Sequence, residues 1–326
     1  MELVMLTLSE AKGKHLAGET LRSAQGDGYR FADRDSVKQG WYLIARNRIS
    51  KIRAVNVGPH RVLVYRDLDG RVHVTEAQCA HLGADLARAF VTSNGLRCAF
   101  HGWCWGADGA CTASPGNRSI PNRRLRTYVT EERIGFIWAW LGGLPEFPLP
   151  EPPPWHQWTL LPQSVRAHPD TTFANGFDLA HFGPSHGIEV KTKSLHVDSW
   201  AISHRIEGRL PLRPPLVAVG LGGATLDATF TQYGGGIVHV HVQHPIEYLI
   251  VFTIRPDANG HSKTQTILFL PRRRDIVRAL ALLWATALDD IPLMESIAWT
   301  RGFAESDAVL EQYVRFVENM PQWRDQ

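Results

Sequence analysis

Proline is concentrated in one short stretch of this chain and divides the sequence into two parts. Residues 144–155 (LPEFPLPEPPPW) hold six prolines in twelve positions. Proline lacks a backbone N–H and fixes φ, so this stretch can continue neither a helix nor a central strand. We therefore predict a semi-rigid connector over residues 144–160. The length of 326 residues suits two domains of ordinary size on either side of it.

The part before the connector, residues 39–143, has the pattern of a small all-β domain. Two β-branched runs, 61–66 (RVLVYR) and 71–75 (RVHVT), flank an Asp-Gly pair that is typical of a hairpin turn. The apolar run 134–140 (IGFIWAW) is expected to close the domain as a buried strand. Residues 1–38 form a polar lead-in to which we assign no role.

The part after the connector, residues 161–326, mixes helices and strands. A short helix is expected over 172–182 and a long one over 274–288, where apolar residues recur with a period of 3.6. The strands expected between them are residues 224–233, 237–243, 248–255 and 263–270. A curved antiparallel sheet closed by a long helix fits this order, and such a fold encloses a pocket.

Composition excludes several classes of protein. With 44% hydrophobic and 21% charged residues, the chain is neither disordered nor fibrous. Its net charge of +3 is spread out, so nucleic acid is not an expected partner, and the run Arg272-Arg273-Arg274 is expected to begin a solvated helix face. We expect no membrane span, no secretory signal and no disulfide scaffold, and we therefore predict a cytoplasmic protein.

Two pairs of metal-binding residues lie in turns of the β part. Cys79-x-His81 is followed by Cys98-x-x-His101. Two loops that each offer a thiolate and an imidazole can hold a [2Fe–2S] cluster, with both cysteines on one iron and both histidines on the other. The same four residues also suit a tetrahedral zinc ion, so zinc stays the alternative.

Residues 79–103 resemble the Rieske domain of ring-hydroxylating and related oxygenases. The Rieske domain of respiratory complexes carries two further cysteines, whose places are taken here by Ala84 and Phe100. The His-Gly-Trp ending is likewise similar to the oxygenase branch. Cys104 and Cys111 have no place in the motif and are expected to be structural thiols.

A second group of metal-binding residues follows the connector. Asp178 and His181 share a helix face, but His186 lies five residues beyond His181 and would point about 140° away on an unbroken helix. Gly183-Pro184 is expected to break the helix and let His186 turn back. Two imidazoles and one carboxylate would then form a facial triad that leaves positions open for O2 on Fe(II).

The third ligand is expected from far along the chain. Asp290 is the best candidate, because the resemblance implies an Asp on the long helix with a Glu five residues later, here Glu295. Asp289 stays the alternative. The resemblance also implies a place near the iron for Asn175, whose role it leaves open.

The resemblance covers about residues 38–318 and implies the whole architecture. The expected fold is α+β, with an N-terminal all-β Rieske [2Fe–2S] domain and a C-terminal helix-grip (START-like) catalytic domain built on an antiparallel sheet. It also implies a homotrimer in which His101 of one chain hydrogen-bonds Asp178 of its neighbour, and Asp178 in turn holds His181. A separate NAD(P)H-dependent reductase, with or without a ferredoxin, would supply electrons, because no GxGxxG or flavin motif is present.

The expected function is that of a Rieske non-heme iron oxygenase with O2 as co-substrate. Residues 216–254, which should wall the pocket, contain only two charges, Asp227 and Glu247, so the substrate is expected to be largely apolar. His239-x-His241 lies within this stretch, either as pocket hydrogen-bonding groups or as a surface pair.

The segment from Asp290 to Glu295 is similar to the matching segment of ketosteroid hydroxylases and cholesterol desaturases, which favours a polycyclic or steroid-like substrate. Hydroxylation is the expected reaction. Desaturation, demethylation and N-oxygenation would use the same iron ligands. A non-catalytic Rieske electron carrier fused to a lipid-binding pocket is the alternative.

Overall fold

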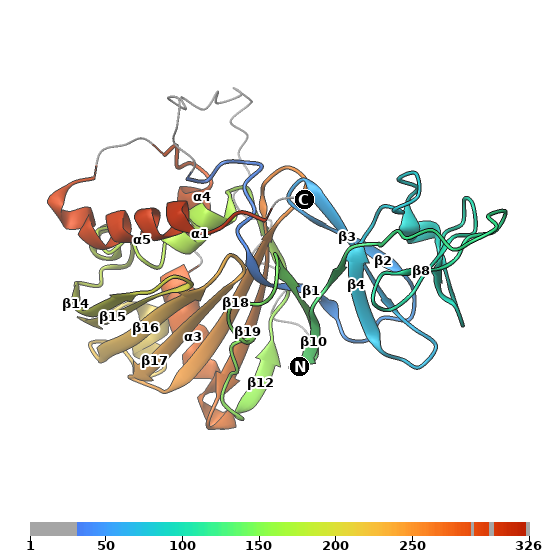
Figure 1. The fold of residues 1–326 in the computed structure, drawn as a ribbon. Coiled ribbons are helices and arrows are strands. Elements are labelled where there is room, and N and C mark those ends of the chain that lie inside the picture. The colour runs from blue at the N-terminus through green and yellow to red at the C-terminus, as the bar shows by residue number, and fades with distance from the viewer. Residues whose placement is uncertain (1–30, 288–289, 300–302, 324–326) are drawn as a thin grey trace, which may run out of the picture.

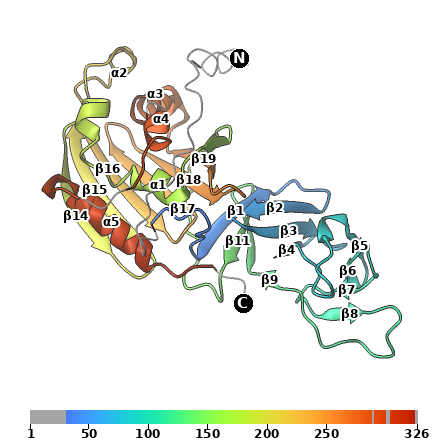
Figure 2. The same cartoon turned by 90° about the horizontal axis from the view of Figure 1, so that it is seen from above.

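The computed structural model describes residues 31–287, 290–299 and 303–323 (Figure 1). A smaller, strand-rich N-terminal part lies beside a larger part that is built around one long sheet, and Figures 1 and 2 show the two side by side. Among the described residues, no helix combines the length and the apolar character needed to cross a bilayer. The architecture is α+β, as the sequence predicted.

The N-terminal part consists of three small antiparallel sheets, ordered β2-β3-β4-β9, β5-β6-β7-β8 and β1-β11-β10. The predicted hairpin is β3 with β4, and the predicted closing strand is β11, in which every residue is buried. The strands are β1 (Gly40–Arg46), β2 (Arg53–Val57), β3 (His60–Arg66), β4 (Val72–Glu76), β5 (Phe90–Thr92), β6 (Gly95–Arg97), β7 (Cys104–Trp105), β8 (Cys111–Ala113), β9 (Thr127–Tyr128), β10 (Thr130–Arg133) and β11 (Phe136–Leu141).

The larger part is an antiparallel sheet ordered β12-β19-β18-β17-β16-β15-β14, with β13 also paired to β19. The four predicted strands are β16 to β19, while β12 arises from residues expected in the connector. The strands are β12 (His156–Thr159), β13 (Gln163–Val165), β14 (Val190–Val197), β15 (Ala201–Arg209), β16 (Thr225–Tyr233), β17 (Ile237–His244), β18 (Tyr248–Pro256) and β19 (Ser262–Leu270).

Helices cover one face of this sheet. The α-helices are α1 (Pro169–Ala174), α2 (Pro214–Ala218), α3 (Ile276–Ala287), α4 (Asp290–Met294) and α5 (Ala308–Asn319), and three short 3-10 helices span Leu86–Arg88, Arg273–Asp275 and Glu305–Asp307. The long helix predicted over 274–288 corresponds to α3, and residue 288 lies outside the described residues. The predicted helix over 172–182 is wrong in extent, because α1 ends at Ala174 and a π-helix, Phe182–His186, follows after a turn.

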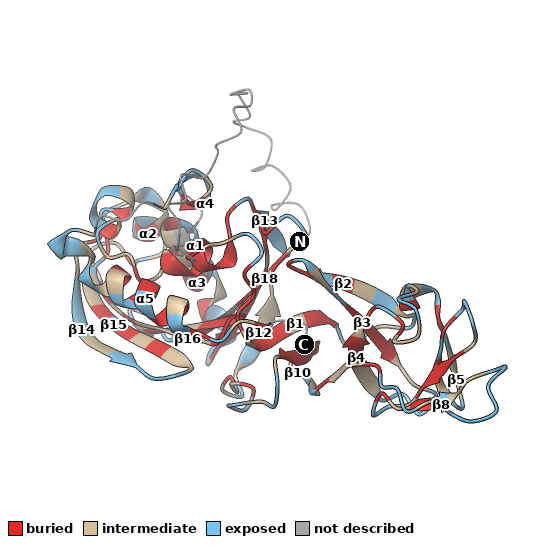
Figure 3. Cartoon of the chain, turned by 45° about the horizontal axis from the view of Figure 1, so that its top comes forward, coloured by how far each residue is buried: buried red, intermediate tan, exposed pale blue. Residues whose placement is uncertain are grey.

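The two faces of the long sheet pack against different partners. On the inner face, Ala228 and Val242 share an apolar cluster with Ala279 and Leu282 of α3. The outer face packs against the N-terminal part, and Figure 3 shows the strands at this junction as buried. The outer cluster includes Trp41, Trp138, Trp140, Leu249, Val251, Ile267 and Phe269. The N-terminal part does not cover the inner face, so a site can form there between the sheet and the helices.

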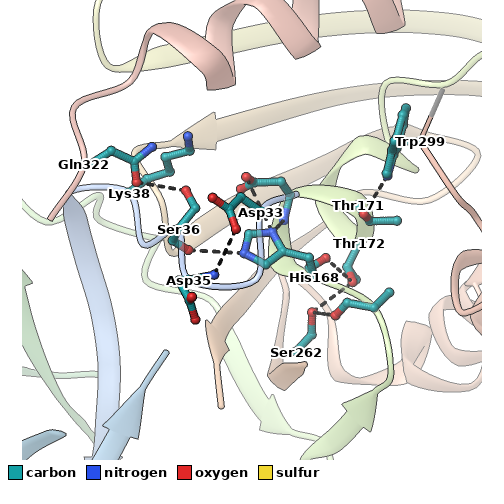
Figure 4. Close-up of polar contacts among 12 residues, drawn as sticks. Asp33, Asp35, Ser36, Lys38, His168, Thr171, Thr172, Ser262, Trp299 and Gln322 are labelled. Atoms are coloured by element: carbon teal, nitrogen blue, oxygen red, sulfur yellow. Dashed lines mark hydrogen bonds and ion pairs between the residues drawn. The ribbon is translucent and has the colours of Figure 1, made fainter. Parts of the chain in front are cut away.

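A network of polar contacts fixes the start of α1 (Figure 4). His168 Nε2 lies 3.2 Å from the carbonyl oxygen of Ser36, whose side chain hydrogen-bonds that of Gln322 at 2.8 Å. The hydroxyls of Thr172 and Ser262 lie 3.0 Å apart and join the helix to β19. Segments from both ends of the chain therefore hold α1, which leads directly into the second group of predicted metal ligands.

Gly95 lies where an added side chain would meet the backbone of a neighbouring strand. It has φ +101°, and a Cβ there would lie 2.1 Å from the carbonyl oxygen of Trp105. We expect Gly95→Ala to lower the free energy of unfolding by about 3 kcal/mol through clash and backbone strain. Gly116 is the control: it has φ +85° with open space around it, so Gly116→Ala should cost only about 1–2 kcal/mol. If chemical denaturation showed the same loss of unfolding free energy for both variants, the clash with Trp105 would not contribute.

Candidate metal centres

Two loops of the N-terminal part have the same backbone design. Gly83 N–H donates to the carbonyl of Cys79 at 2.8 Å, and Gly102 N–H donates to the carbonyl of Cys98 at 3.1 Å. Both glycines have positive φ, +77° and +70°, which a Cβ would strain. Each loop thus turns tightly directly after its cysteine and carries the cysteine and the histidine of one pair.

The four predicted cluster residues come together at the tips of these loops. Cys79 and Cys98 are buried, with 2% and 3% of their surface exposed, whereas His81 and His101 lie further out with ring centroids 4.9 Å apart. Trp103 stacks on the ring of His81 at 4.1 Å. Burial raises the pKa of the Cys79 thiol, and the neighbouring Cys98 raises it further.

The spacing of these four side chains bears on which metal group they could hold. One tetrahedral zinc ion would bring all four ligand atoms within about 4 Å of one another. The two thiols are buried and the two imidazoles lie further out, so the four side chains form an inner and an outer pair. Thiols inside and imidazoles outside suit a group that spans two metal ions.

Cys104 and Cys111 lie beneath these loops on β7 and β8. Both are buried free thiols, and burial raises the pKa of each. The sulfur of Cys104 contacts the carbonyl oxygen of Gly102 at 3.5 Å. Their position fits the structural role predicted for them.

The second set of predicted ligands converges on the inner side of the long sheet. His181, His186 and Asp290 each place a ligand atom within 4.8 Å of the other two. The distance from His186 Nε2 to Asp290 Oδ1 is 3.1 Å, and that from His181 Nε2 to Asp290 Oδ2 is 3.8 Å. Asp290 and His186 are each only 1% exposed. The alternative carboxylate, Asp289, lies outside the described residues.

A π-helix, rather than a break, brings the two histidines together. We predicted that Gly183-Pro184 would end the helix, but the chain stays helical from Phe182 to His186 in a wider turn. In such a turn the repeat is longer than in an α-helix, so side chains five residues apart face the same side. Gly187, at φ +68°, then ends the turn.

Two further predicted residues contact this triad. The Asn175 side-chain N–H donates to Asp290 Oδ2 at 2.8 Å, so Asn175 lies directly beside the carboxylate of the triad. Asp178 Oδ2 lies 3.7 Å from His181 Nδ1, on the side of the ring away from Asp290. The side chain of Asp178 is 31% exposed, so it reaches from His181 to the molecular surface.

Opposite charges shift the pKa values of the triad. Burial would lower the pKa of His181, but Asp178 and Asp290 outweigh it and raise that pKa to about 9. Burial would raise the pKa of Asp290, but the two imidazoles and Asn175 hold it well below its ordinary value. The carboxylate is therefore ionised at neutral pH, as a metal ligand must be.

Several buried polar atoms of the triad have no hydrogen-bond partner. They are both ring nitrogens of His181, Nδ1 of His186 and Oδ1 of Asp290. Unsatisfied buried polar atoms are costly and uncommon. A divalent cation between the rings and the carboxylate would satisfy the converging atoms, so the residues present fit a metal ion.

A salt bridge that the sequence did not reveal holds α4 in place. Glu295, just after α4, accepts hydrogen bonds from the Arg166 backbone at 2.9 Å and from its guanidinium at 2.9 and 3.1 Å. Met294 packs against Val165 and Ala167 beside it. These contacts tie the helix that carries Asp290 to the end of β13.

The surroundings of the triad are apolar. Phe182, next to His181, belongs to the inner cluster together with Leu216, Leu226 and Ile250. Asp227 forms a bidentate pair with Arg205 at 2.7 and 2.9 Å on the opposite face of the sheet, and Glu247 is exposed. Neither charge of the stretch 216–254 therefore lies in this cluster.

His239 and His241 also lie away from the triad. They alternate along β17 with Val238, Val240 and Val242, which face inward. On the outer face, His239 contacts Tyr233 and His241 contacts Trp155. Burial lowers the pKa of His239 to about 4, so that imidazole is neutral at neutral pH. The structure does not place these histidines in the pocket.

Comparison with known proteins assigns the N-terminal part. Residues 40–128 match the family model of the Rieske [2Fe-2S] domain. This part of the chain is a Rieske domain. The match includes all four residues at the loop tips, and a Rieske domain indicates a [2Fe–2S] cluster rather than zinc.

Relatives by sequence are oxygenases. The chain is 32% identical over 136 residues to a 3-ketosteroid-9-alpha-monooxygenase oxygenase component of Mycolicibacterium smegmatis, a match that spans 38% of this chain and 36% of that protein. It is 24% identical over 276 residues to aminopyrrolnitrin oxygenase PrnD of Pseudomonas fluorescens, spanning 73% and 76%. The match thus covers well under half of the ketosteroid relative but most of the second. The expected relationship to the Rieske oxygenases is confirmed.

Solved structures share the fold over most of the chain. Dicamba monooxygenase bound to dicamba superposes with a TM-score of 0.66 at 16% identity, covering 87% of this chain and 96% of that one. NdmA of Pseudomonas putida CBB5 with caffeine gives 0.62 at 19%, covering 85% and 89%. The fold class is therefore confirmed: a Rieske domain followed by a helix-grip (START-like) domain with an antiparallel sheet.

Proposed function

We propose that this chain is the oxygenase component of a Rieske non-heme iron oxygenase that oxidises an apolar organic substrate with O2. The observation that carries the proposal is the convergence of His181, His186 and Asp290 on one point, in a chain that also has a Rieske domain. A mere electron carrier has no use for a second metal-binding triad beside an apolar cluster.

The residues divide between two iron centres. Cys79 and Cys98 would bind one iron of the [2Fe–2S] cluster, and His81 and His101 the other. His181, His186 and Asp290 would bind a mononuclear Fe(II). The Fe(II) supplies a site for O2 activation when electrons arrive from the cluster. Asn175 orients Asp290, and Asp178 orients His181.

The arrangement of the chain supports a homotrimer or another closed assembly of its copies. Strands β6 and β7, which flank the second cluster loop, lie at the end of the Rieske domain away from α1 and α4 (Figure 2). Electrons therefore need a neighbouring chain. Phe100 beside His101 is 68% exposed, and Asp178 reaches the surface. We propose that His101 of one chain hydrogen-bonds Asp178 of the next.

The substrate and partners are part of the same proposal. The uncharged inner cluster supports an apolar, polycyclic or steroid-like substrate, and two groups of relatives are named for ketosteroid and cholesterol oxidation. Hydroxylation is the proposed reaction, and desaturation or demethylation would use the same residues. A separate NAD(P)H-dependent reductase, directly or through a ferredoxin, would reduce the cluster. The two cysteines that are not assigned to the cluster, Cys104 and Cys111, are free thiols and support a reducing, cytoplasmic location.

Counting iron and acid-labile sulfide in the purified chain tests the proposal. About three irons and about two sulfides per chain are expected, one iron more than a Rieske cluster holds. About two of each, after supply of excess Fe(II), would instead indicate an electron carrier with a lipid-binding pocket, and the oxygenase proposal would be wrong.

A further inference from the structure

Helix α3 carries an apolar stripe on its outward face. Val277, Leu280 and Trp284 are 63%, 37% and 44% exposed, and their spacing places them on one side of the helix. The opposite side is buried in the inner cluster through Ala279, Leu282 and Ala285. A surface helix of a globular protein normally has a polar outer face. Helix α3 is instead apolar on both sides, so its outward face has the character of a contact surface.

Helix α2 extends this surface. It packs against α3 and contributes Val217, which is 52% exposed, while Leu212, two residues before the helix, is 79% exposed. These two side chains lie together, because a Cβ on Gly222 would touch both of them. Figure 2 shows α2 and α3 along the same side of the molecule. We call the five residues Leu212, Val217, Val277, Leu280 and Trp284 the α2–α3 patch.

Positive charge adjoins the α2–α3 patch at the start of α3. Arg272, Arg273 and Arg274 are all exposed. The acidic residue beside them, Asp275, is buried and lies 2.7 Å from Arg272 and 3.8 Å from Arg278. Four arginines against one aspartate leave a formal charge of +3 on residues 272–287. From the sequence we predicted that this arginine run begins a solvated helix face. In the structure the exposed arginines lie next to the apolar α2–α3 patch.

We propose that the α2–α3 patch docks on an anionic lipid surface. Exposed Trp and Leu beside a cluster of arginines is the composition of a helix that lies in the plane of a membrane interface, with its apolar side chains at the acyl boundary and its arginines among the headgroups. A helix of twelve residues is about 18 Å long and lies on a bilayer rather than across it.

Charge favours lipid over a second copy of the chain as the occupant. A second copy docked patch to patch would bring the same positive segment against this one, whereas anionic headgroups neutralise it. The geometry also suits an apolar substrate. The buried side of α3 packs in the same apolar cluster as Phe182, which lies next to the triad. With the outward side of α3 in contact with lipid, this helix alone would separate the lipid from that cluster. Lipid docking itself does not depend on the iron chemistry.

Co-sedimentation of the full chain with vesicles tests the proposal. Vesicles of phosphatidylcholine with about a third phosphatidylglycerol should bind the chain at least about tenfold more tightly than phosphatidylcholine alone, and salt should weaken the binding. Val277→Ser with Trp284→Ser should reduce binding about tenfold. Arg273→Glu with Arg274→Glu should remove the preference for anionic lipid. An unchanged far-ultraviolet circular dichroism spectrum and an unchanged thermal unfolding curve in both variants would show that the domain carrying the patch is folded.

Leu161→Ser is the matched control, because Leu161 is 68% exposed but lies outside the patch. It should bind vesicles as the parent chain does. Absence of vesicle binding by the parent, or undiminished binding by the Val277/Trp284 variant, would overturn the proposal. So would an oligomer that dissociates in that variant, since the patch would then be a contact between copies. None of these outcomes changes the iron and sulfide count.

Discussion

Replacing His186 with alanine is expected to remove one iron from each chain and to abolish substrate oxidation, while the visible spectrum of the cluster stays intact. His186 is 1% exposed, its Nε2 lies 3.1 Å from Asp290, and the group of described residues that converge here consists of His181, His186 and Asp290. Loss of one ligand of three should reduce bound mononuclear iron to background. Turnover should fall at least about a thousandfold. Iron analysis and product formation are the measurements.

His196→Ala is the control for this variant. His196 is exposed on β14, away from the triad, and its removal should change neither the iron count nor turnover. If His186→Ala retained the full iron content of the parent chain, the assignment of the triad would be wrong. If iron were lost but turnover persisted, the mononuclear site would not be where oxidation occurs.

Replacing Asp178 with asparagine is expected to leave both metal centres bound and to slow turnover about a hundredfold. The substitution keeps the shape of the side chain but removes the charge that lies 3.7 Å from His181 Nδ1. Because Asp178 reaches the surface, the change should disrupt the contact with His101 of a neighbouring chain rather than the triad itself. The measurement is the rate at which O2 with substrate reoxidises a reduced cluster.

The exposed carboxylate of Asp69, which lies on the β3–β4 turn, provides the matched control. Asp69→Asn should leave the reoxidation rate unchanged. A normal rate in Asp178→Asn would exclude the bridging role, and loss of iron in that variant would make Asp178 a support of the metal site instead of a link between chains.

Local patterns explain which elements could be predicted. Strands β16 to β19 have long apolar or β-branched runs, and α3 has a clear helical period, so each stands out in its own sequence. The edge strand β14 (VKTKSLHV) is largely polar and exposed and looks like a loop. Helix α5 was not predicted, although its buried residues, such as Tyr313 and Val317, have helical spacing, because polar and charged residues divide its apolar positions.

The two metal centres also differ in how much of each could be predicted from local sequence patterns. The cluster residues are adjacent pairs in tight turns, so the sequence alone brings each cysteine next to its histidine. The approach of His186 to His181 was predicted, but through a helix break, whereas backbone geometry widens the turn instead. The bridge between Arg166 and Glu295 joins residues 129 positions apart. No local signal marks such a contact, because tertiary packing alone creates it.

The central claim is that one polypeptide holds a Rieske cluster and a second iron with open coordination positions. Electron paramagnetic resonance of the dithionite-reduced chain under nitric oxide tests it most directly, since nitric oxide binds Fe(II) where O2 would. The account predicts two signals, one from the reduced cluster and one from an iron–nitrosyl centre that disappears in His186→Ala. A cluster signal alone, from protein supplied with excess Fe(II), would contradict it.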